Sequence, residues 1–366
     1  MNKKLISWLH LYPGLISSLL VFFVCITGTI IVYSDEIMDL SAGKACYVSE
    51  IKEERLPVDR LINIIKKEYP QRKAVSYMVA YKDPKRSVRF NTYGKEDGLR
   101  MVYMDPYTGK ILKDDGTIYF FYITAHLHNS LLLGKTGQWI IDIATIILIL
   151  ELITGLILWW PKRWNRSSRN SSFKIKWKSN AKRLNYDLHK VLGFYALGVI
   201  LLLSITGLLI AFNPLSALVL KSAGADTSHQ WEKQLPGFQP DKQAYDLNRL
   251  IKNTFDRYPQ KSEVQVATYK LDSSGYYSLR VADRIGLKSA QRPVFKVYNR
   301  FSGEEIEIPE PALKHEKIEN TIWVLHMGNW MGPVGKFVTF LGGLIASSLS
   351  LTGFYIWWGR RKKGKG

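Results

Sequence analysis

Hydrophobic residues along this chain are gathered in four blocks separated by polar segments. The blocks cover residues 11–32, 139–160, 191–212 and 337–358. Each block holds about 20 mostly apolar residues, the length of helix that crosses a hydrocarbon core of roughly 30 Å. A buried helix of a soluble protein rarely has so long an apolar run. The pattern therefore predicts an α-helical polytopic membrane protein with four transmembrane helices.

The two long polar segments between these blocks predict small α+β domains. Residues 56–71 are typical of a helix, with Asp59 as its N-cap and Pro70 as its stop, and the residues that follow alternate as in a strand. Residues 248–260 repeat the same order, including the runs Arg-Leu-Ile and Tyr-Pro-Gln. We therefore expect a helix packed on a small antiparallel sheet in each segment.

The hydrophobic blocks form an internal repeat. Residues 127–160 align without a gap with 325–358, and residues 9–33 align with 188–212. Such a repeat predicts two copies of one unit, which we expect to be related by a twofold axis along the membrane normal. The shared residues pair as His10 with His189, His128 with His326, Gly14 with Gly193, Thr27-Gly28 with Thr206-Gly207, and Thr154-Gly155 with Thr352-Gly353.

The net charge of +20 is concentrated in three segments. They are Lys3 and Lys4, the loop of residues 162–183, and the tail of residues 360–365. All three lie on one side of a four-span protein, which the positive-inside rule makes cytoplasmic. The basic residues therefore indicate an N-in, C-in protein in a lipid bilayer, with no nucleic acid as partner. The first block is longer than the core of a signal peptide and lacks a cleavage site, so we expect an uncleaved anchor.

These features predict eight successive segments. They are transmembrane helix 1 (residues 1–33), a first extracytoplasmic domain (34–124), an interfacial helix with transmembrane helix 2 (125–160), a basic cytoplasmic loop (161–187), transmembrane helix 3 (188–212), a second extracytoplasmic domain (213–321), an interfacial helix with transmembrane helix 4 (322–358), and a basic cytoplasmic tail (359–366).

Four of the seven histidines belong to the repeat and form two equivalent pairs. His10 and His189 lie at one membrane face, and His128 and His326 lie at the other. Facing imidazoles in a four-helix membrane bundle are what a six-coordinate haem iron requires, so each pair could hold one b-type haem. Zinc would need four ligands, and no Cys or acidic residue accompanies either pair at a helical spacing. A single histidine at a helix end could also place its polar tip among lipid headgroups.

Other polar residues are weaker candidates. His126 has no partner in the repeat but could replace His128 as the outer ligand, and Asp142 and Glu151 are acids inside a membrane span, where charge is costly and usually functional. Either acid could serve a quinol site, balance the charge of a haem, or pair with a hydroxyl of a neighbouring helix. The repeated glycines could allow close helix packing or make room for a macrocycle. His229 and His315 have no ligand-type neighbours in sequence, so we expect them at the surface.

The chain lacks other redox motifs. Its two cysteines, Cys25 and Cys46, provide no disulfide framework and no C-x-x-C-H attachment for c-type haem. No G-x-G-x-x-G follows a predicted strand, so there is no built-in nicotinamide or flavin domain. Electrons would have to come from a separate donor, either a cytoplasmic reductase or quinol.

The pattern His-x₃-Gly, the Leu-His and Gly-x-x-Gly runs and Thr-Gly-x-x-x-Trp-Trp resemble the PepSY-associated transmembrane family over nearly the whole chain. The resemblance implies four spans, two extracytoplasmic PepSY-like domains, and b-type haem held by membrane histidines in the bacterial cytoplasmic membrane. Members include ferric-siderophore reductases. By that resemblance, the positions to carry over as haem ligands are His10, His189, His128 and His326.

The resemblance implies a haem-containing membrane reductase that moves electrons to an extracytoplasmic acceptor. The acceptor would be ferric iron in a siderophore or another chelate, which releases Fe²⁺ on reduction. PepSY-like units also occur in proteins thought to bind peptides or to regulate proteases. The alternative is therefore a membrane-anchored binding or regulatory module without redox activity.

Overall fold

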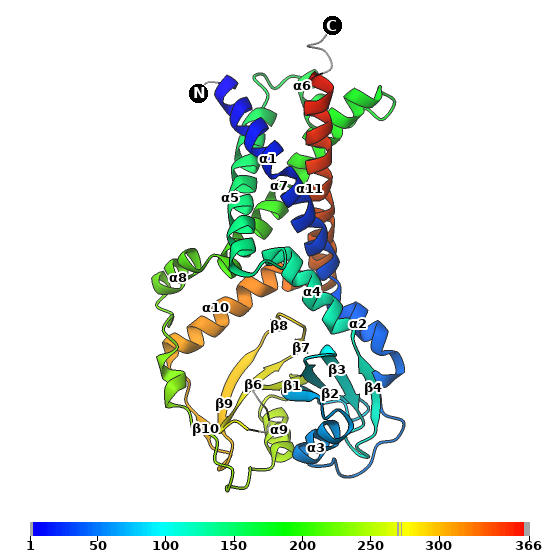
Figure 1. Ribbon diagram of the computed structural model, residues 1–366. Coiled ribbons are helices and arrows are strands. Elements are labelled where there is room, and N and C mark those ends of the chain that lie inside the picture. Colours follow the sequence, from blue (N-terminus) through cyan, green and yellow to red (C-terminus); the bar gives the residue numbers. More distant parts are fainter. Residues whose placement is uncertain (1–2, 269–270, 272, 362–366) are drawn as a thin grey trace. The chain divides into compact units, whose positions relative to one another are not determined.

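The chain forms two compact units in the computed structural model, which describes residues 3–268, 271 and 273–361 (Figure 1). We call Met1–Tyr33, Ile123–Ser216 and Leu325–Gly366 the helical unit. The sheet unit consists of Ser34–Tyr122 and Ala217–Val324. Residues 362–366 of the predicted basic tail lie outside the described residues, and they include three of its lysines: Lys362, Lys363 and Lys365.

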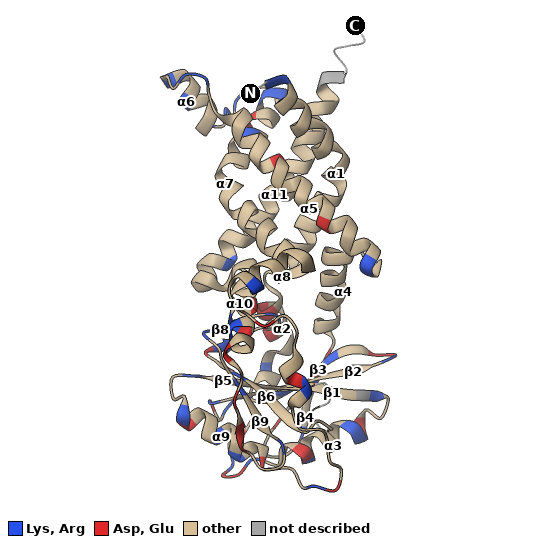
Figure 2. Cartoon of the chain, turned by 90° about the vertical axis from the view of Figure 1, so that its left-hand side faces the viewer, with Lys and Arg blue, Asp and Glu red and all other residues tan. Residues whose placement is uncertain are grey.

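Four long helices make up most of the helical unit. They are α1 (Lys3–Ile31), α5 (Gly134–Trp159), α7 (Ala181–Ala211) and α11 (Gly332–Arg361). Helices α1 and α7 each pack against both α5 and α11, which gives a four-helix bundle. All four are long and apolar enough to cross a membrane, and few charged residues lie along them (Figure 2). The prediction of a polytopic helical membrane protein is therefore confirmed.

The third span begins earlier than we predicted. The helix starts at Ala181, where the side chain of Asn180 caps it by accepting a hydrogen bond from the backbone N–H of Arg183 at 2.9 Å. A cap of this kind satisfies an otherwise unpaired amide, so the helix can begin in polar sequence before the apolar block. The loop ahead of it contains the short helix α6 (Arg166–Phe173).

Each of the second and fourth spans follows a shorter helix and a sharp break, as the sequence predicts. Helix α4 (Thr117–Ser130) precedes α5, and α10 (Glu310–His326) with the 3₁₀ turn η3 (Asn329–Met331) precedes α11. The chain turns through positive φ angles at Gly134 (58°) and Gly332 (55°). Glycine is the residue that adopts such angles most easily.

The helices α4 and α10 also begin earlier than predicted. Their first turns belong to the sheet unit, where Ile118 and Phe121 of α4 are buried in an apolar cluster with Met38. In α10, the Asn320 side chain exchanges two hydrogen bonds with the backbone of Ala290, at 3.0 and 3.1 Å. These contacts stabilise helical turns that the sequence pattern assigns to the polar domains.

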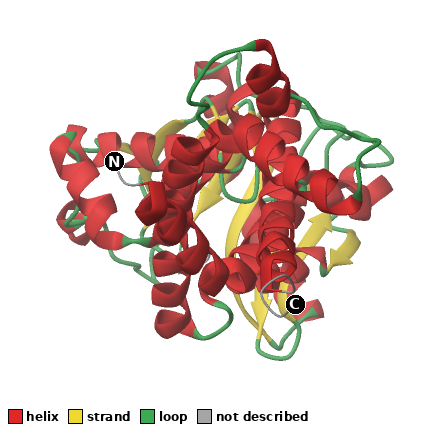
Figure 3. Ribbon diagram, turned by 90° about the horizontal axis from the view of Figure 1, so that it is seen from above, coloured by secondary structure: helices red, strands yellow, loops and turns green. Residues whose placement is uncertain are grey.

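The sheet unit contains an eight-stranded antiparallel sheet in the order β10-β9-β6-β5-β1-β2-β3-β4. The strands drawn in Figure 3 all belong to this unit. Their bounds are β1 (Arg72–Tyr81), β2 (Val88–Gly94), β3 (Gly98–Met104), β4 (Ile111–Asp115), β5 (Glu263–Ala267), β6 (Tyr276–Ala282), β9 (Val294–Asn299) and β10 (Glu305–Ile306), with β7 (Arg284–Ile285) and β8 (Ala290–Gln291) as a separate pair. The other elements are the helices α2 (Ser34–Ala42), α3 (Val58–Glu68), α8 (Asn213–Ser222) and α9 (Leu247–Arg257) and the 3₁₀ turns η1 (Gly43–Cys46) and η2 (Gln230–Gln234).

The two polar segments build this sheet together instead of folding as two separate domains. Strand β1 of the first segment pairs with β5 of the second, from Tyr77 opposite Ala267 to Tyr81 opposite Glu263. One core cluster contains Leu61 of α3 as well as Leu250 of α9. Each half keeps the predicted helix and four strands, and the pairing covers two edges that would otherwise be exposed.

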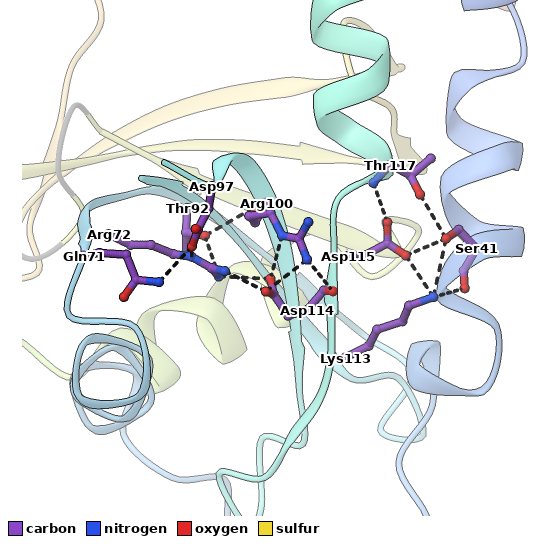
Figure 4. Close-up of polar contacts among 10 residues, drawn as sticks. All are labelled: Ser41, Gln71, Arg72, Thr92, Asp97, Arg100, Lys113, Asp114, Asp115 and Thr117. Carbon is purple, nitrogen blue, oxygen red and sulfur yellow. Dashed lines mark hydrogen bonds and ion pairs between the residues drawn. The ribbon is translucent and has the colours of Figure 1, made fainter. Parts of the chain in front are cut away.

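An ion-pair network around the buried Arg72 side chain stabilises the first half of the sheet (Figure 4). The Arg72 guanidinium donates to both carboxylate oxygens of Asp114, at 2.9 and 2.6 Å, and to Asp97 at 3.1 Å. Arg100 also donates to Asp114, at 3.2 Å. The network thus links β1, β3 and β4 with the turn between β2 and β3.

A second polar cluster surrounds the carboxylate of Asp115, at the end of β4 (Figure 4). It accepts hydrogen bonds from the Ser41 hydroxyl at 2.6 Å and the Thr117 amide at 2.7 Å, and it pairs with Lys113 at 3.0 Å. Burial alone would raise the pKa of Asp115, but these donors outweigh burial and lower its pKa to about 2. The cluster ties α2 to the start of α4.

Candidate functional site

Inside the helical unit, each of the four repeated histidines lies against a Thr-Gly dipeptide of a neighbouring helix. The arrangement is the same in both halves of the repeat, because the helix that carries each dipeptide is also equivalent. The contacts join His10 to Thr154-Gly155, His128 to Thr27-Gly28, His189 to Thr352-Gly353, and His326 to Thr206-Gly207.

The threonines orient the imidazoles. The distances from Nδ1 to the threonine Oγ1 are 3.0 Å for His10, 3.4 Å for His128, 2.9 Å for His189 and 3.0 Å for His326. Each threonine hydroxyl donates its hydrogen to the carbonyl four residues earlier in its own helix, so its oxygen can only accept from the imidazole. The carbonyl three residues before each threonine also faces Nδ1. All four histidines are therefore Nδ1–H tautomers, in which Nε2 is the nitrogen that carries a lone pair.

The glycines of these dipeptides leave space for the rings. A β-carbon at Gly28 would lie 2.8 Å from Cε1 of His128, closer than carbon atoms approach without a shift. A β-carbon at Gly155, Gly207 or Gly353 would lie 3.1, 3.2 or 3.2 Å from the corresponding histidine carbon. The Thr-Gly dipeptide thus combines an acceptor for Nδ1–H with a surface on which the imidazole packs.

The fold brings the histidines together in the pairs that the repeat predicts. The ring centres of His10 and His189 are 6.3 Å apart, and those of His128 and His326 are 6.2 Å apart. Two imidazoles on opposite sides of one metal ion have ring centres about 6.2 Å apart, from a bond of about 2 Å and roughly 1.1 Å from nitrogen to ring centre. Both pairs therefore have the spacing of trans axial ligands.

A cavity of about 370 Å³ adjoins the first pair, a size typical of ligand pockets. Both rings line it, and most of the remaining lining is apolar. Four repeated glycines also line it: Gly14, Gly155, Gly193 and Gly353. Among the described residues, no group of three or more His, Cys, Asp and Glu side chains is close enough, as the side chains are placed, to hold a metal ion. Each pair supplies two imidazoles, so it could hold a metal whose other ligands come with it, as the four nitrogens of a porphyrin do.

Glu151 makes the two halves of the first pair different. Its Oε2 lies 3.0 Å from Nδ1 of His10, and its Oε1 is buried without a hydrogen-bond partner among the described residues. A β-carbon at Gly14 would lie 2.7 Å from Glu151, whereas one at Gly193 would lie 3.6 Å from Leu349, which is the repeat equivalent of Glu151. His10 thus has a carboxylate beside it, where the equivalent position beside His189 is apolar.

The other weak candidates lie apart from the first pair. Asp142 is buried in α5, about 13 Å along the helix from Glu151. In α4, the ring that faces His326 is that of His128, and the carbonyl of His126 accepts hydrogen bonds from Leu132 at 3.2 Å and Ser130 at 2.9 Å. The geometry therefore favours His128 over His126 as the paired residue.

Sequence reasoning missed two features. It recognised the repeated Thr-Gly dipeptides but considered only the glycines, although a hydroxyl kept at four equivalent positions is a signal for a polar role. It also expected no ligand-type neighbours for His229 and His315, which was wrong, because their ring centres lie 4.8 Å apart in the sheet unit.

Comparison with known proteins supports the resemblance seen in the sequence. A family model described as the PepSY-associated TM region matches residues 7–360. The match covers all four long helices of the bundle and both polar segments. No curated protein matches the chain significantly.

Proposed function

The chain belongs to the PepSY-associated transmembrane family, and we propose that it is a membrane reductase that holds two b-type haems. It would pass electrons across the bacterial cytoplasmic membrane to ferric iron in a siderophore or another chelate, which then releases Fe²⁺. The observation that carries this proposal is the two histidine pairs. In each pair Nδ1 of both rings contacts a threonine hydroxyl, and the ring centres are 6.3 or 6.2 Å apart.

The residues of the chain have distinct parts in this proposal. His10 and His189 would hold one haem, and His128 and His326 the other. The threonines fix the Nδ1–H tautomer and the ring direction, which is how outer-shell hydrogen bonds orient metal ligands. The apolar lining of the cavity excludes water and lowers the local dielectric, both of which tune a reduction potential.

When bound, haem supplies reversible one-electron transfer at its iron. His10 and Thr27, which holds His128, are separated by 17 positions of α1, or about 25 Å along the helix. His189 and Thr206 have the same separation in α7. The two pairs thus lie at levels that together cover most of a membrane about 30 Å thick.

The basic segments suggest the orientation. By the positive-inside rule they favour a cytoplasmic location for the ends of the chain and for the His10 pair, where a cytoplasmic reductase or quinol would donate electrons. The His128 pair would then lie near the extracytoplasmic face of the membrane. A reporter fused at Lys176 should read as cytoplasmic, and one fused at Lys95 should read as extracytoplasmic. An extracytoplasmic Lys176 would refute this orientation. Fusions near Lys270 and after Lys365 should read as extracytoplasmic and cytoplasmic, respectively, although both lysines lie outside the described residues.

The reaction at the outer face is one electron added to chelated Fe³⁺ to give Fe²⁺. Hard oxygen ligands bind the smaller charge more weakly, so reduction promotes release. The donor loses the electron, and no bond within the chain has to form or break.

The direct test is reoxidation of chemically reduced protein in nanodiscs by a ferric chelate. The wild type should be reoxidised faster than in buffer alone, and His326→Ala should abolish the transfer while the spectrum of the His10 pair remains. His126→Ala is the matched control, since it removes a histidine from α4 but leaves the pair. If the reduced protein transfers electrons to no ferric chelate but does reduce another external acceptor, chelated ferric iron is not its substrate. Protein that binds no haem would instead favour the binding-module alternative.

A further inference from the structure

Two histidines from distant parts of the chain meet in the sheet unit. His229 lies directly before η2, and His315 lies in α10, with ring centres 4.8 Å apart and ring planes at 66°. The segment around His229 is fastened to α10, because the Asp226 N–H donates to the Pro311 carbonyl at 2.9 Å. The ring of His315 in turn donates to the carbonyl of Asp226. These hydrogen bonds therefore hold the rings of His229 and His315 close together.

In its neutral form, each ring carries its hydrogen on Nδ1 and a lone pair on Nε2. The partner of His315 Nδ1 is a carbonyl, which only accepts, so Nδ1 carries the hydrogen and Nε2 a lone pair. His229 Nδ1 lies 2.9 Å from Oε1 of Glu232, and a carboxylate again accepts. A histidine whose second nitrogen donates to a carbonyl or carboxylate is the usual form of a metal ligand.

The ring centres of His229 and His315 lie closer together than those of the two histidine pairs in the helical unit. Two imidazoles bound cis on one metal ion have ring centres about 4.4 Å apart at a 90° angle and about 5.1 Å apart at a tetrahedral angle, for bonds of about 2 Å. The observed 4.8 Å lies between these values, whereas the pairs in the bundle have the trans spacing.

Glu319 is in position to provide a third ligand. It follows His315 by one helical turn, and its Oε2 lies 3.9 Å from Nε2 of His315. Ligands on one metal ion lie about 3 Å apart, so the carboxylate has to approach by roughly 1 Å. Its side chain is 55% exposed and can turn, whereas the nearby Glu316 is engaged with Arg280 at 3.8 Å.

We propose that His229, His315 and Glu319 bind a divalent first-row transition-metal ion, with Glu319 drawn in on binding. Two imidazoles and one carboxylate leave positions open for water, a set that suits Zn²⁺ or Fe²⁺ and does not favour Ca²⁺ or Mg²⁺. Glu232 acts as a positioning residue that holds the ring of His229. The site does not depend on the proposed electron transfer.

The test is equilibrium dialysis of the full-length protein in detergent against Zn²⁺, followed by metal analysis. Wild type should hold one more Zn²⁺ per chain than H229A/H315A, and the difference cancels any zinc at other histidines. Glu232→Gln should weaken the site about 10- to 100-fold, as expected for an outer-shell carboxylate. Glu319→Gln should weaken it at least as much, and Asp241→Asn, which removes an exposed acid elsewhere in the sheet unit, should not change it.

Equal zinc in wild type and the double variant would overturn the proposal. Unchanged affinity in Glu319→Gln would overturn the part assigned to that carboxylate. Because His315 is mostly buried, the double variant could fail to fold, which a melting curve would reveal. His229→Ala alone then decides, since that side chain is 53% exposed and its loss should still remove the difference. Zinc retained by His229→Ala would refute the site.

Discussion

Replacing Gly28 with alanine tests whether the pair of His128 and His326 needs the space that glycine leaves beside the ring of His128. The new β-carbon would lie 2.8 Å from Cε1 of His128, while ordinary carbon contacts begin near 3.4 Å. The ring or the helix must therefore move by at least about 0.6 Å. Metal sites tolerate changes of only about 0.2 Å in ligand distance, so a haem iron held by His128 as proposed would lose this ligand.

We expect Gly28→Ala to lower the bound haem from two toward one per chain and to leave the haem proposed at His10 and His189 in place. The same calculation gives about 0.2 Å for Gly207→Ala and Gly353→Ala, which is within that tolerance, so both variants should retain both haems with weaker binding. The measurement is the haem-to-protein ratio, with electron paramagnetic resonance to detect loss of the low-spin ferric state.

The matched control is Gly198→Ala in α7, because a β-carbon there would meet nothing within 4 Å. It makes the same change within a membrane helix and should bind haem as the wild type does. Two full haems with an unchanged low-spin signal in Gly28→Ala would refute the reasoning. So would a Gly198→Ala protein that loses as much haem as Gly28→Ala.

Three further predictions follow from the same contacts. Replacing His10 or His189 with alanine should each remove about half the haem, and the double variant no more; losses that add independently would show that the two do not share one iron. If the contact of Glu151 with His10 is worth about 1 kcal/mol, Glu151→Leu should raise the reduction potential of the haem proposed at His10 and His189 by roughly 40 mV. A spectroelectrochemical titration measures this shift, and an unchanged potential would exclude the effect. The pKa of Asp115 is lowered from 3.8 to about 2, so its carboxylate should contribute about 2.5 kcal/mol to the free energy of unfolding of the sheet unit above pH 4. This contribution should be lost as the pH falls from 4 toward 2. Unfolding measurements over that pH range should show the loss in the wild type but not in Asp115→Asn.

The features that could be predicted from the sequence are those that the repeat makes visible. The four spans follow from apolar length, and the breaks before α5 and α11 follow from Gly134 and Gly332. The histidine pairs could be predicted because each of the four histidines has an equivalent in the other half. In such cases local pattern and global fold agree.

The features that could not be predicted depend on contacts between distant segments. Pairing of β1 with β5 joins two segments that are far apart in sequence, and nothing in either strand pattern names its partner. The meeting of His229 with His315 depends on the hydrogen bonds of Asp226, which no periodicity encodes. The early starts of α4 and α10 reflect tertiary packing of residues such as Phe121.

The central claim, that the helical unit holds two haems between its histidine pairs, is tested most directly by the visible spectrum and haem content of the purified protein. Expression with ample haem should give a red protein with two haems per chain and the low-spin spectrum of two histidine ligands. A colourless protein prepared in the same way would contradict the claim, and so would bound haem that persists when all four of His10, His128, His189 and His326 are replaced.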